Sequence, residues 1–258
     1  MSTVTLAMRD SSTMVRRQLK RLLRYPAMTV QLVVTPVILL LVFVYVFGGT
    51  LGDGLGGGGR DAYVDYVVPG ILLMAAATAA TGTAVMVATD MTEGIVARFR
   101  TMRISRASIF TGHVVGSVIQ QFLGMAVLIG IALAIGFRPN ATAVEWLAAA
   151  GLLTLFVVAI TWLAVALGLK APTPESASNA PMPLILLPFL GSGFVPTDSM
   201  PTVLRWFAEY QPFTPIMETV RGLLLGTPIG NSAAVATAWC TGIAVLSYLW
   251  AKRTFNQK

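Results

Sequence analysis

The chain has 258 residues, of which 55% are hydrophobic and only 11% are charged, with a formal net charge of +7. A soluble domain of this size carries about a quarter charged residues, so the composition excludes an ordinary soluble protein. The single cysteine and single histidine, Cys240 and His113, exclude an intrachain disulfide and a clustered His/Cys metal site.

Six long windows contain no Asp, Glu, Lys or Arg, and each exceeds the about 20 apolar residues that cross the hydrocarbon core of a bilayer. Apolar residues run through these windows without the alternation of barrel strands, so we expect helices. The sequence therefore predicts an all-α membrane protein, a single transmembrane domain over residues 1–258. The expected spans are about 27–48, 66–89, 108–136, 146–168, 178–195 and 231–251.

The basic residues predict the orientation of these spans. All but four of the 18 Lys and Arg residues lie before the first span, between spans two and three, after span four or in the tail. Cytoplasmic loops are enriched in Lys and Arg, so both termini should be cytoplasmic. Nucleic-acid binding is another interpretation of a basic chain, but no basic fold stands apart from the spans. Abundant Ala, Gly, Val and Arg suggest a GC-rich bacterium, and hence a bacterial inner membrane.

Two different segments flank the first span. Residues 12–24 predict an amphipathic helix along the membrane interface, with an apolar stripe opposite a basic face. The basic face contains Arg16, Arg17, Lys20 and Arg21. A mechanical role and simple anchoring of the topology are both open for this helix. The linker after the span, GGTLGDGLGGGGRDAYVD, is rich in glycine and is expected to be a flexible loop.

The segment between spans two and three, DMTEGIVARFRTMRISR, combines two carboxylates with four arginines. Asp90 and Glu93 have the spacing of a capping box, which predicts that a short cytoplasmic helix begins there. Ile95, Phe99 and Met102 would share one side of it. Anchoring of the topology is one interpretation, and docking into a groove of a cytoplasmic partner is the other.

The fifth predicted span is interrupted by Pro181, Pro183 and Pro188 and ends in the sequence GSGF. Proline inside a membrane helix is tolerated where the helix faces protein or a water-filled cavity. Broken helices are typical of transport pathways, although packing kinks without function are also common.

The stretch from 194 to 228 is too charged to cross the bilayer and too apolar for a free loop. Pro201 and Pro215 suit the first positions of two short helices, with Thr214 as the expected N-cap of the second. Glu218 and Arg221 are expected to pair at i, i+3. We expect two amphipathic helices, within residues 198–226, that dip into the outer leaflet. A surface hairpin is the weaker alternative, because it would expose several large apolar side chains.

The chain has no energy source of its own. No G-x-x-x-x-G-K-[ST] motif occurs, and the spans contain no ionisable residue except His113 near one end. ATP binding through a P-loop is therefore excluded, and ion coupling is disfavoured. An intramembrane serine protease is also disfavoured, because Ser192 and His113 should lie at opposite membrane faces. We expect no catalytic residue, metal or cofactor in this chain.

Two motifs resemble those of ABC-2 type transporter permeases, in particular the daunorubicin-resistance group of drug exporters. The cytoplasmic motif comprises Gly94, Arg98, Phe99, Arg100, Ser105 and Arg106. The more specific motif follows span five and comprises Phe194, Pro196, Met200, Pro201, Gln211, Pro212, Thr214 and Arg221. The resemblance covers the chain end to end. Arg103 departs from the family pattern, which usually has proline at that position.

The resemblance implies a permease that works with a separate cytoplasmic ATPase. Two permeases, either two copies of this chain or this chain with a related permease, and two ATPases would form the exporter, with ATP and Mg²⁺ bound by the ATPase. Residues 90–106, with Glu93, Arg98, Phe99 and Arg100 foremost, and the interfacial helix would contact that ATPase. The helices at 198–226, including Glu218, would line the exit.

The sequence thus predicts an ATP-driven exporter subunit for an amphiphilic drug or lipid-like compound. A cell-envelope lipid or glycolipid is the alternative cargo. A non-transporting membrane scaffold or immunity subunit is an alternative of a different class.

Overall fold

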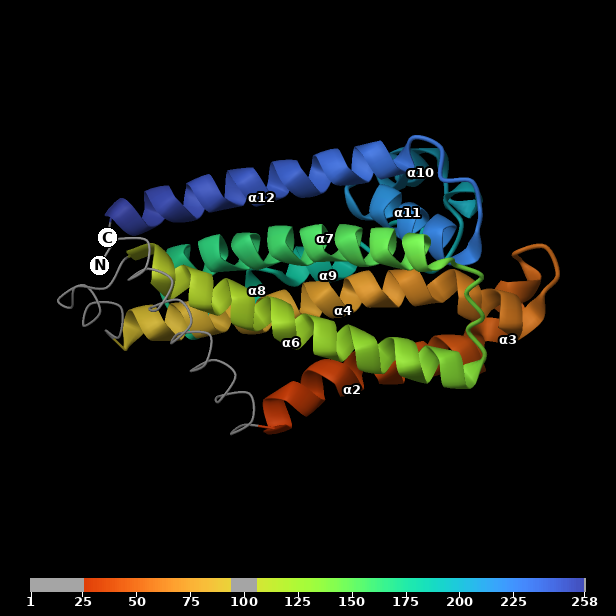
Figure 1. Cartoon of the computed structure of the whole chain (residues 1–258), viewed down its shortest axis with the longest axis horizontal. Coiled ribbons are helices and arrows are strands. Elements are labelled where there is room, and N and C mark those ends of the chain that lie inside the picture. Colours follow the sequence, from red (N-terminus) through yellow and green to blue (C-terminus); the bar gives the residue numbers. More distant parts are fainter. Residues whose placement is uncertain (1–25, 94–105, 258) are drawn as a thin grey trace.

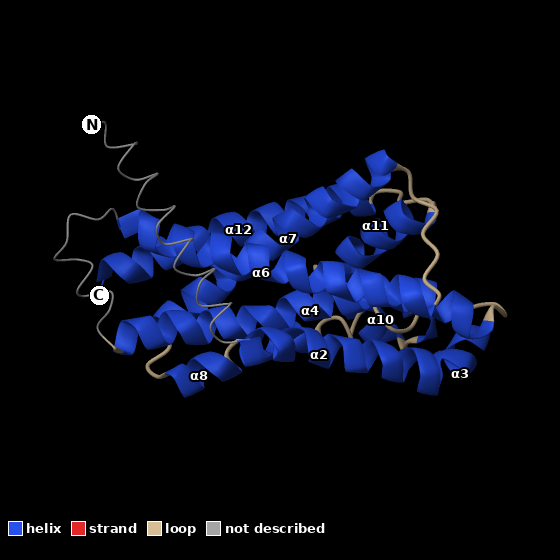
Figure 2. Ribbon diagram, turned by 60° about the horizontal axis from the view of Figure 1, so that its bottom comes forward, coloured by secondary structure: helices blue, strands red, loops and turns tan. Residues whose placement is uncertain are grey.

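The computed structural model describes residues 26–93 and 106–257, and every regular element in these ranges is helical (Figures 1 and 2). In chain order the elements are α2 (Pro26–Val42), the π-helical η1 (Phe43–Phe47), α3 (Gly48–Asp53), α4 (Gly59–Thr92), α6 (Arg106–Ile135), α7 (Ala143–Lys170), α8 (Pro174–Asn179), α9 (Met182–Leu186), the 3-10 helix η2 (Thr197–Ser199), α10 (Thr202–Tyr210), α11 (Phe213–Leu225) and α12 (Ser232–Gln257). The predicted interfacial helix at 12–24 lies outside the described residues, as does most of the predicted coupling loop at 90–106.

Five helices in the described part are long and apolar enough to cross a membrane. They are the continuous α2–η1–α3 segment from Val33 to Asp53, α4, the part of α6 from Val114 to Ile135, α7, and α12 up to Phe255. These correspond to five of the six predicted spans. A multi-pass, all-helical membrane protein is therefore confirmed at this level.

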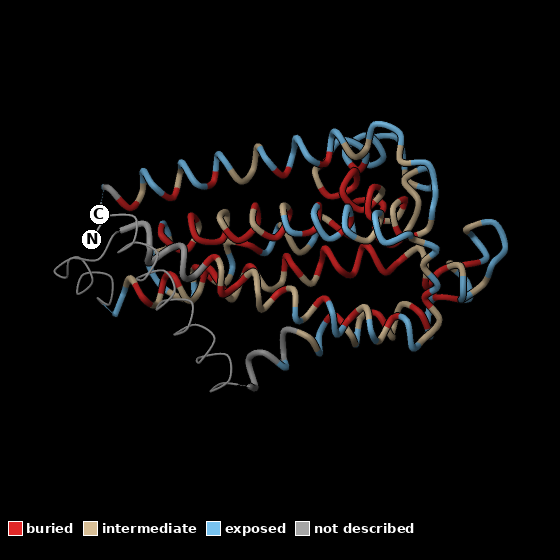
Figure 3. Tube along the Cα trace, in the orientation of Figure 1, coloured by how far each residue is buried: buried red, intermediate tan, exposed pale blue. Residues whose placement is uncertain are grey.

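Helices α4 and α7 form the centre of the bundle, and α2, α6 and α12 surround them. About two thirds of the most apolar stretch of α4 and α7 is buried (61% and 67%), against 22% or less in the other three. The burial pattern in Figure 3 shows the same contrast between α4 and the outward side of α12. Small residues allow the central pair to approach closely. A Cβ atom on Gly168 of α7 would lie only 2.5 Å from the Ala84 carbonyl oxygen of α4.

The glycine-rich linker is shorter than predicted. Residues Gly48–Asp53 are helical, and α4 begins at Gly59, seven residues before the predicted start of the second span. The turn between them contains Gly56 and Gly57, both in left-handed backbone conformations that favour glycine. A Cβ atom on Gly52 would collide with the Gly59 backbone, so this close approach also requires glycine.

The other end of α4 corrects the predicted helix start at Asp90. Helix α4 continues through Thr92, and Glu93 is its C-cap residue. Asp90 is buried in the last turn of this helix and is not the start of one. The Asp–x–x–Glu spacing suggested the start of a new helix. The same spacing also occurs at the end of α4, which continues beyond the charge-free window of the second predicted span.

The fifth predicted span, 178–195, is not one continuous helix. The chain forms α8, then α9, then a series of turns through Phe194. Proline lacks the N–H that would donate within a helix and clashes with the preceding turn. Pro181 lies between α8 and α9, and Pro188 follows α9, which explains both interruptions. The expected break is confirmed, whereas a sixth helix of spanning length is not present in this segment.

Candidate functional site

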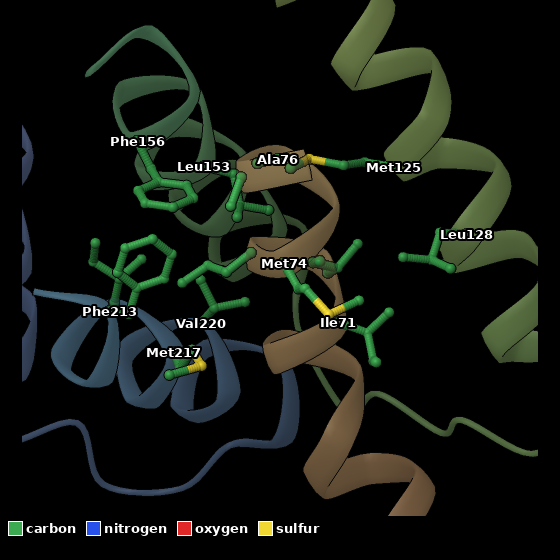
Figure 4. Packing of buried hydrophobic residues seen from close by; sticks show 14 of the residues in the cluster. Ile71, Met74, Ala76, Met125, Leu128, Leu153, Phe156, Phe213, Met217 and Val220 are labelled. Atoms are coloured by element: carbon green, nitrogen blue, oxygen red, sulfur yellow. The ribbon is translucent and has the colours of Figure 1, made fainter. Parts of the chain in front are cut away.

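Helix α11 is embedded in the bundle at the end where α4 begins. Its residues Phe213, Ile216, Met217, Val220 and Leu224 are buried in the main apolar core. Figure 4 shows Phe213 and Val220 facing the central helices. The Met217 side chain lies against Gly191 and Gly193 in the turns after α9. The Phe213 ring meets Phe156 of α7 edge to face, with centroids 5.2 Å apart. The predicted apolar stripe of this helix is therefore a packing surface within the chain.

Arg221 of α11 joins three segments that are distant in sequence. Its Nε and Nη2 atoms donate to the Tyr66 carbonyl oxygen of α4, at 3.2 and 3.1 Å. Nη2 also donates to the Ser192 carbonyl oxygen, at 2.6 Å, in the turns that follow α9. The guanidinium carbon lies 3.8 Å from the centroid of the Tyr66 ring. Such a planar, multivalent contact is specific to arginine, because lysine offers only a point charge.

These contacts correct the predicted Glu218–Arg221 ion pair. In the part of the chain that the structure describes, Arg221 binds backbone carbonyls and the Tyr66 ring, and Glu218 accepts from the Ser232 hydroxyl at 3.3 Å. The i, i+3 spacing permits a local pair, but the half-buried Arg221 guanidinium donates to fixed backbone carbonyls of two other segments. Glu218 instead connects α11 to the start of α12.

Gln211 and Thr214 bind the same turns from the start of α11. Gln211 Nε2 donates to the Leu187 carbonyl oxygen and to Thr214 Oγ1, at 3.2 and 3.1 Å. Thr214 Oγ1 also accepts from the Ser192 backbone N–H at 3.3 Å. Helix α11 begins at Phe213 after Pro212, so the prediction of Thr214 as its N-cap is wrong. Its hydroxyl serves a long-range contact in place of a cap.

Close backbone approaches complete this site. A Cβ atom on Gly70 of α4 would lie 2.5 Å from the Gly193 carbonyl oxygen, and one on Gly191 would collide with the Gln211 side chain. The Tyr63 hydroxyl donates to the Phe194 carbonyl oxygen at 3.1 Å. We call Tyr66, Ser192, Gln211, Thr214 and Arg221 the α4–α11 cluster. It fixes α11 and the turns after α9 against α4.

The remaining predicted residues of this region lie around the cluster. The Phe194 ring stacks on Phe189, with centroids 4.3 Å apart, and lies 4.5 Å from Phe43. Pro196 and Pro201 precede η2 and α10, and Pro201 is the N-cap of α10 and not its first residue. The structure therefore brings Phe194, Gln211, Thr214 and Arg221 together, whereas Glu218 and the two prolines have other neighbours.

Helix α10 differs from α11, because its apolar side chains are exposed. Val203 is 85% exposed, and Trp206 and Tyr210 are each 65% exposed. On its polar side Arg205 forms ion pairs with Asp198 and Glu209. The Glu209 carboxylate accepts from Arg205 Nε and raises the pKa of the Arg205 guanidinium. The amphipathic helix predicted here is confirmed.

Of the residues predicted to contact the ATPase, the structure describes only those at the two ends of the loop between α4 and α6. Glu93 is exposed at the end of α4, and Arg106 is the first residue of α6. The remaining predicted contact residues lie outside the described residues: Gly94, Arg98, Phe99, Arg100, Ser105, Arg16, Arg17, Lys20 and Arg21. Their role in binding an ATPase stays a prediction.

A second polar group lies near the middle of the bundle and was missed from the sequence. Gln121 Nε2 of α6 donates to Thr161 Oγ1 of α7 at 3.2 Å. The hydroxyls of Thr83 and Ser117 are 3.0 Å apart, between α4 and α6. The sequence does contain a signal for this group, because residues 120 and 121 are adjacent glutamines in a strongly apolar window. Polar residues in a membrane helix usually face protein, so these glutamines predict a polar contact inside the bundle.

Among residues 26–93 and 106–257, no group of three or more His, Cys, Asp or Glu side chains could hold a metal ion. Cys240 is buried in α12, and Ser192 offers its carbonyl oxygen to Arg221 and its N–H to Thr214.

Known proteins resemble this chain over most of its length. Residues 10–225 match the family model described as ABC-2 type transporter. The daunorubicin resistance ABC transporter permease protein DrrB1 of Streptomyces coeruleorubidus is 27% identical over 205 residues, which are 79% of this chain and 70% of that protein. The probable doxorubicin resistance ABC transporter permease protein DrrC of Mycobacterium tuberculosis (strain CDC 1551 / Oshkosh) is 24% identical over 229 residues, 89% and 83% of the two chains. Nodulation protein J of Rhizobium leguminosarum bv. trifolii is 25% identical over 218 residues, 81% and 80% of the two chains.

Proposed function

The chain belongs to the ABC-2 type transporter family, and from this premise we propose that it is the permease subunit of an ATP-driven exporter for an amphiphilic drug or lipid-like compound. The match to permeases named for daunorubicin and doxorubicin resistance carries this proposal. Members of this family are membrane subunits without an ATPase domain of their own. The absence of a P-loop motif from the sequence is consistent with that division of labour.

The energy for export comes, in this proposal, from a cytoplasmic ATPase. Two copies of that subunit bind ATP and Mg²⁺, and two permease copies enclose the path. This chain itself holds no cofactor. The uneven distribution of Lys and Arg supports an inner-membrane protein with both termini in the cytoplasm.

This orientation requires an even number of crossings. Five long helices are candidates, and we assign the sixth crossing to the broken segment from α8 to Phe194. It follows the end of α7 at Lys170, and its final turns lie against Tyr63 and Gly70 near the start of α4. Its length, about 20 residues, suffices for a crossing in mostly helical geometry. Interruptions of this kind are tolerated where neighbouring helices cover the backbone, as α4 does here.

We place α10 and α11 at the outer face, where they form the exit gate. Trp and Tyr side chains favour the membrane–water interface, and α10 exposes Trp206 and Tyr210 beside a charged side. The α4–α11 cluster then holds the closed gate, because Arg221 connects α11 both to α4 and to the broken crossing. Opening of this gate would require the Arg221 guanidinium to release the Tyr66 and Ser192 carbonyl oxygens.

Coupling to the ATPase is assigned to the loop between α4 and α6, with Glu93, Arg98, Phe99 and Arg100 foremost. Reversal of charge in Arg98→Glu with Arg100→Glu should abolish co-purification with the ATPase, because a docking surface selects charge. Arg253→Glu, in the cytoplasmic tail, is the control and should leave association unchanged. Normal co-purification and export by the double variant would remove this role.

Reconstitution with an ATPase encoded next to the permease tests the function directly. Inverted vesicles that contain both subunits should accumulate doxorubicin when ATP is supplied. Vesicles with a P-loop lysine variant of the ATPase should not. Stimulation of ATP hydrolysis by an envelope glycolipid in place of the drug would favour the alternative cargo. Uphill transport by the permease alone, or no transport of either cargo, would contradict the proposal.

A further inference from the structure

The bundle contains a small pocket between α2, α4 and α6, apart from the α4–α11 cluster. Val33, Ala75, Ala79, Gln121, Gly124 and Met125 contribute to its wall. Figure 4 shows the Met125 side chain reaching from α6 toward Ala76 on α4, so the apolar part of this wall is continuous with the main core. Small side chains keep the pocket open. A Cβ atom on Gly124 would lie 3.6 Å from Val33 Cγ2.

The side-chain amides of Gln120 and Gln121 form the polar end of this pocket, and Gln121 carries a buried acceptor there without a partner among the described residues. The Gln121 side chain is buried, and its Oε1 accepts no hydrogen bond from any residue that the structure describes. The orientation of its amide is fixed by Thr161. That hydroxyl donates to the Val157 carbonyl oxygen at 2.7 Å, so toward Gln121 it can only accept, and it accepts from Nε2. Oε1 is therefore the free acceptor.

A buried acceptor without a hydrogen bond is unfavourable in an apolar environment. A ligand that donates to this acceptor therefore gains binding free energy from the hydrogen bond. The pocket offers no carboxylate, so a cationic donor would be buried without a counter-charge. A neutral hydroxyl on an apolar body matches both the acceptor and the small-residue wall. Gln121 and Ala75 lie near the middle of α6 and α4, which places the site at mid-membrane depth.

We infer that this pocket binds the hydroxyl-bearing part of an uncharged, lipid-soluble molecule, with Gln121 Oε1 as the acceptor. The identification of that molecule as cargo rests on the proposed function. The binding site itself does not, because it is defined by geometry within one copy of the chain. Gln121 would thus discriminate between compounds that differ by a single hydrogen-bond donor.

A pair of photoreactive probes tests the site: a long-chain alcohol that carries a diazirine, and its methyl ether. The full-length chain in phosphatidylcholine nanodiscs is labelled without any ATPase, and mass spectrometry locates the adducts. The alcohol should label peptides around 75–79 and 120–125 in a saturable manner. It should do so about threefold to tenfold more than the ether, the range expected for one net hydrogen bond.

Variants separate recognition from folding. Gln121→Leu should reduce labelling by the alcohol to that by the ether, and Gly124→Leu should reduce both by filling the pocket. Gly130→Leu is the matched control on α6, because a Cβ atom there meets nothing within 4 Å, and it should label as the parent chain does. Gly124→Leu changes no polar group, so it still tests the pocket if Gln121→Leu unfolds.

Equal labelling by alcohol and ether would overturn the inference, because water or a lipid chain would then occupy the pocket. Labelling that Gly124→Leu does not change would do the same. These outcomes are independent of export. A chain that labels as expected but transports nothing with its ATPase would refute the proposed function and leave the binding site intact.

Discussion

Helices α10 and α11 follow one another in the chain and are both amphipathic, yet they have opposite environments. Phe213 of α11 is 2% exposed, whereas Phe207 of α10 is 41% exposed. The arginine of α11 is held by backbone carbonyls of two other segments, whereas the arginine of α10 pairs with Asp198 and Glu209 nearby in sequence. Of these two helices, α11 packs its apolar side into the core, whereas α10 buries Ala208 alone.

The difference shows that amphipathic character alone does not identify a packing surface. α11 is buried because Phe156 of α7 packs on it and because the turns after α9, which lie against Gly70 of α4, bind it through Ser192. No comparable surface is offered to the apolar side of α10 by the described residues. Substitutions of α11 side chains that contact these partners should therefore alter stability, and equivalent substitutions in α10 should not.

The largest contrast is expected between two phenylalanines. Phe213→Ala removes a buried ring from the core and should lower the free energy of unfolding by about 3–5 kcal/mol. Phe207→Ala removes a partly exposed ring, which should change it by about 0.5 kcal/mol or less. Thermal unfolding of both variants in the same nanodiscs measures this. A similar loss in both would mean that the α10 face is covered by a partner in the membrane.

The next contrast is between the two arginines. Arg221→Met leaves the Tyr66 and Ser192 carbonyls without their charged donor and should destabilise the chain by about 3 kcal/mol. Arg205→Met breaks only exposed ion pairs, which are worth about 0–1 kcal/mol. Arg221→Lys should recover part of the loss, because it keeps the charge without the planar fork. An unfolding midpoint for Arg221→Met equal to that of the parent would show that the guanidinium is not holding α11.

A smaller contrast uses two glycines of α4. Gly70→Ala would place a Cβ atom 2.5 Å from the Gly193 carbonyl oxygen, forcing the turns after α9 away from α4. Such overpacking should lower the free energy of unfolding by about 2 kcal/mol. Gly82→Ala meets nothing within 4 Å and should stabilise by about 0.5–1 kcal/mol through helix propensity. Equal stabilisation in both would show that the turns can shift freely, so that α11 does not depend on them.

The sequence predicted the elements of this region better than their contacts. Charge-free windows located five long helices, and the proline pattern located the break in the fifth predicted span. Local spacing failed where a residue binds across the fold. Local rules predict that Arg221 pairs with Glu218, that Thr214 caps α11 and that a helix begins at Asp90. The observed contacts of these residues depend on which helices pack together. Residue spacing within one segment does not predict which helices pack together.

The smallest contrast lies within α11, between two threonines that are both 2% exposed. Thr214 Oγ1 accepts from the Ser192 N–H and from Gln211 Nε2. Thr214→Val leaves the Ser192 N–H without this acceptor and Gln211 Nε2 with Leu187 alone, and it should destabilise by about 1–2 kcal/mol. Thr219 Oγ1 donates only to the Pro215 carbonyl oxygen of its own helix, so Thr219→Val should change stability by less than about 0.5 kcal/mol. Hydrogen exchange of the Ser192 amide provides the direct readout, with faster exchange expected in Thr214→Val alone. If that amide stays protected when the Thr214 hydroxyl is removed, Arg221 and apolar packing hold the turns. The difference between α10 and α11 would then arise from the Arg221 contacts and from packing alone.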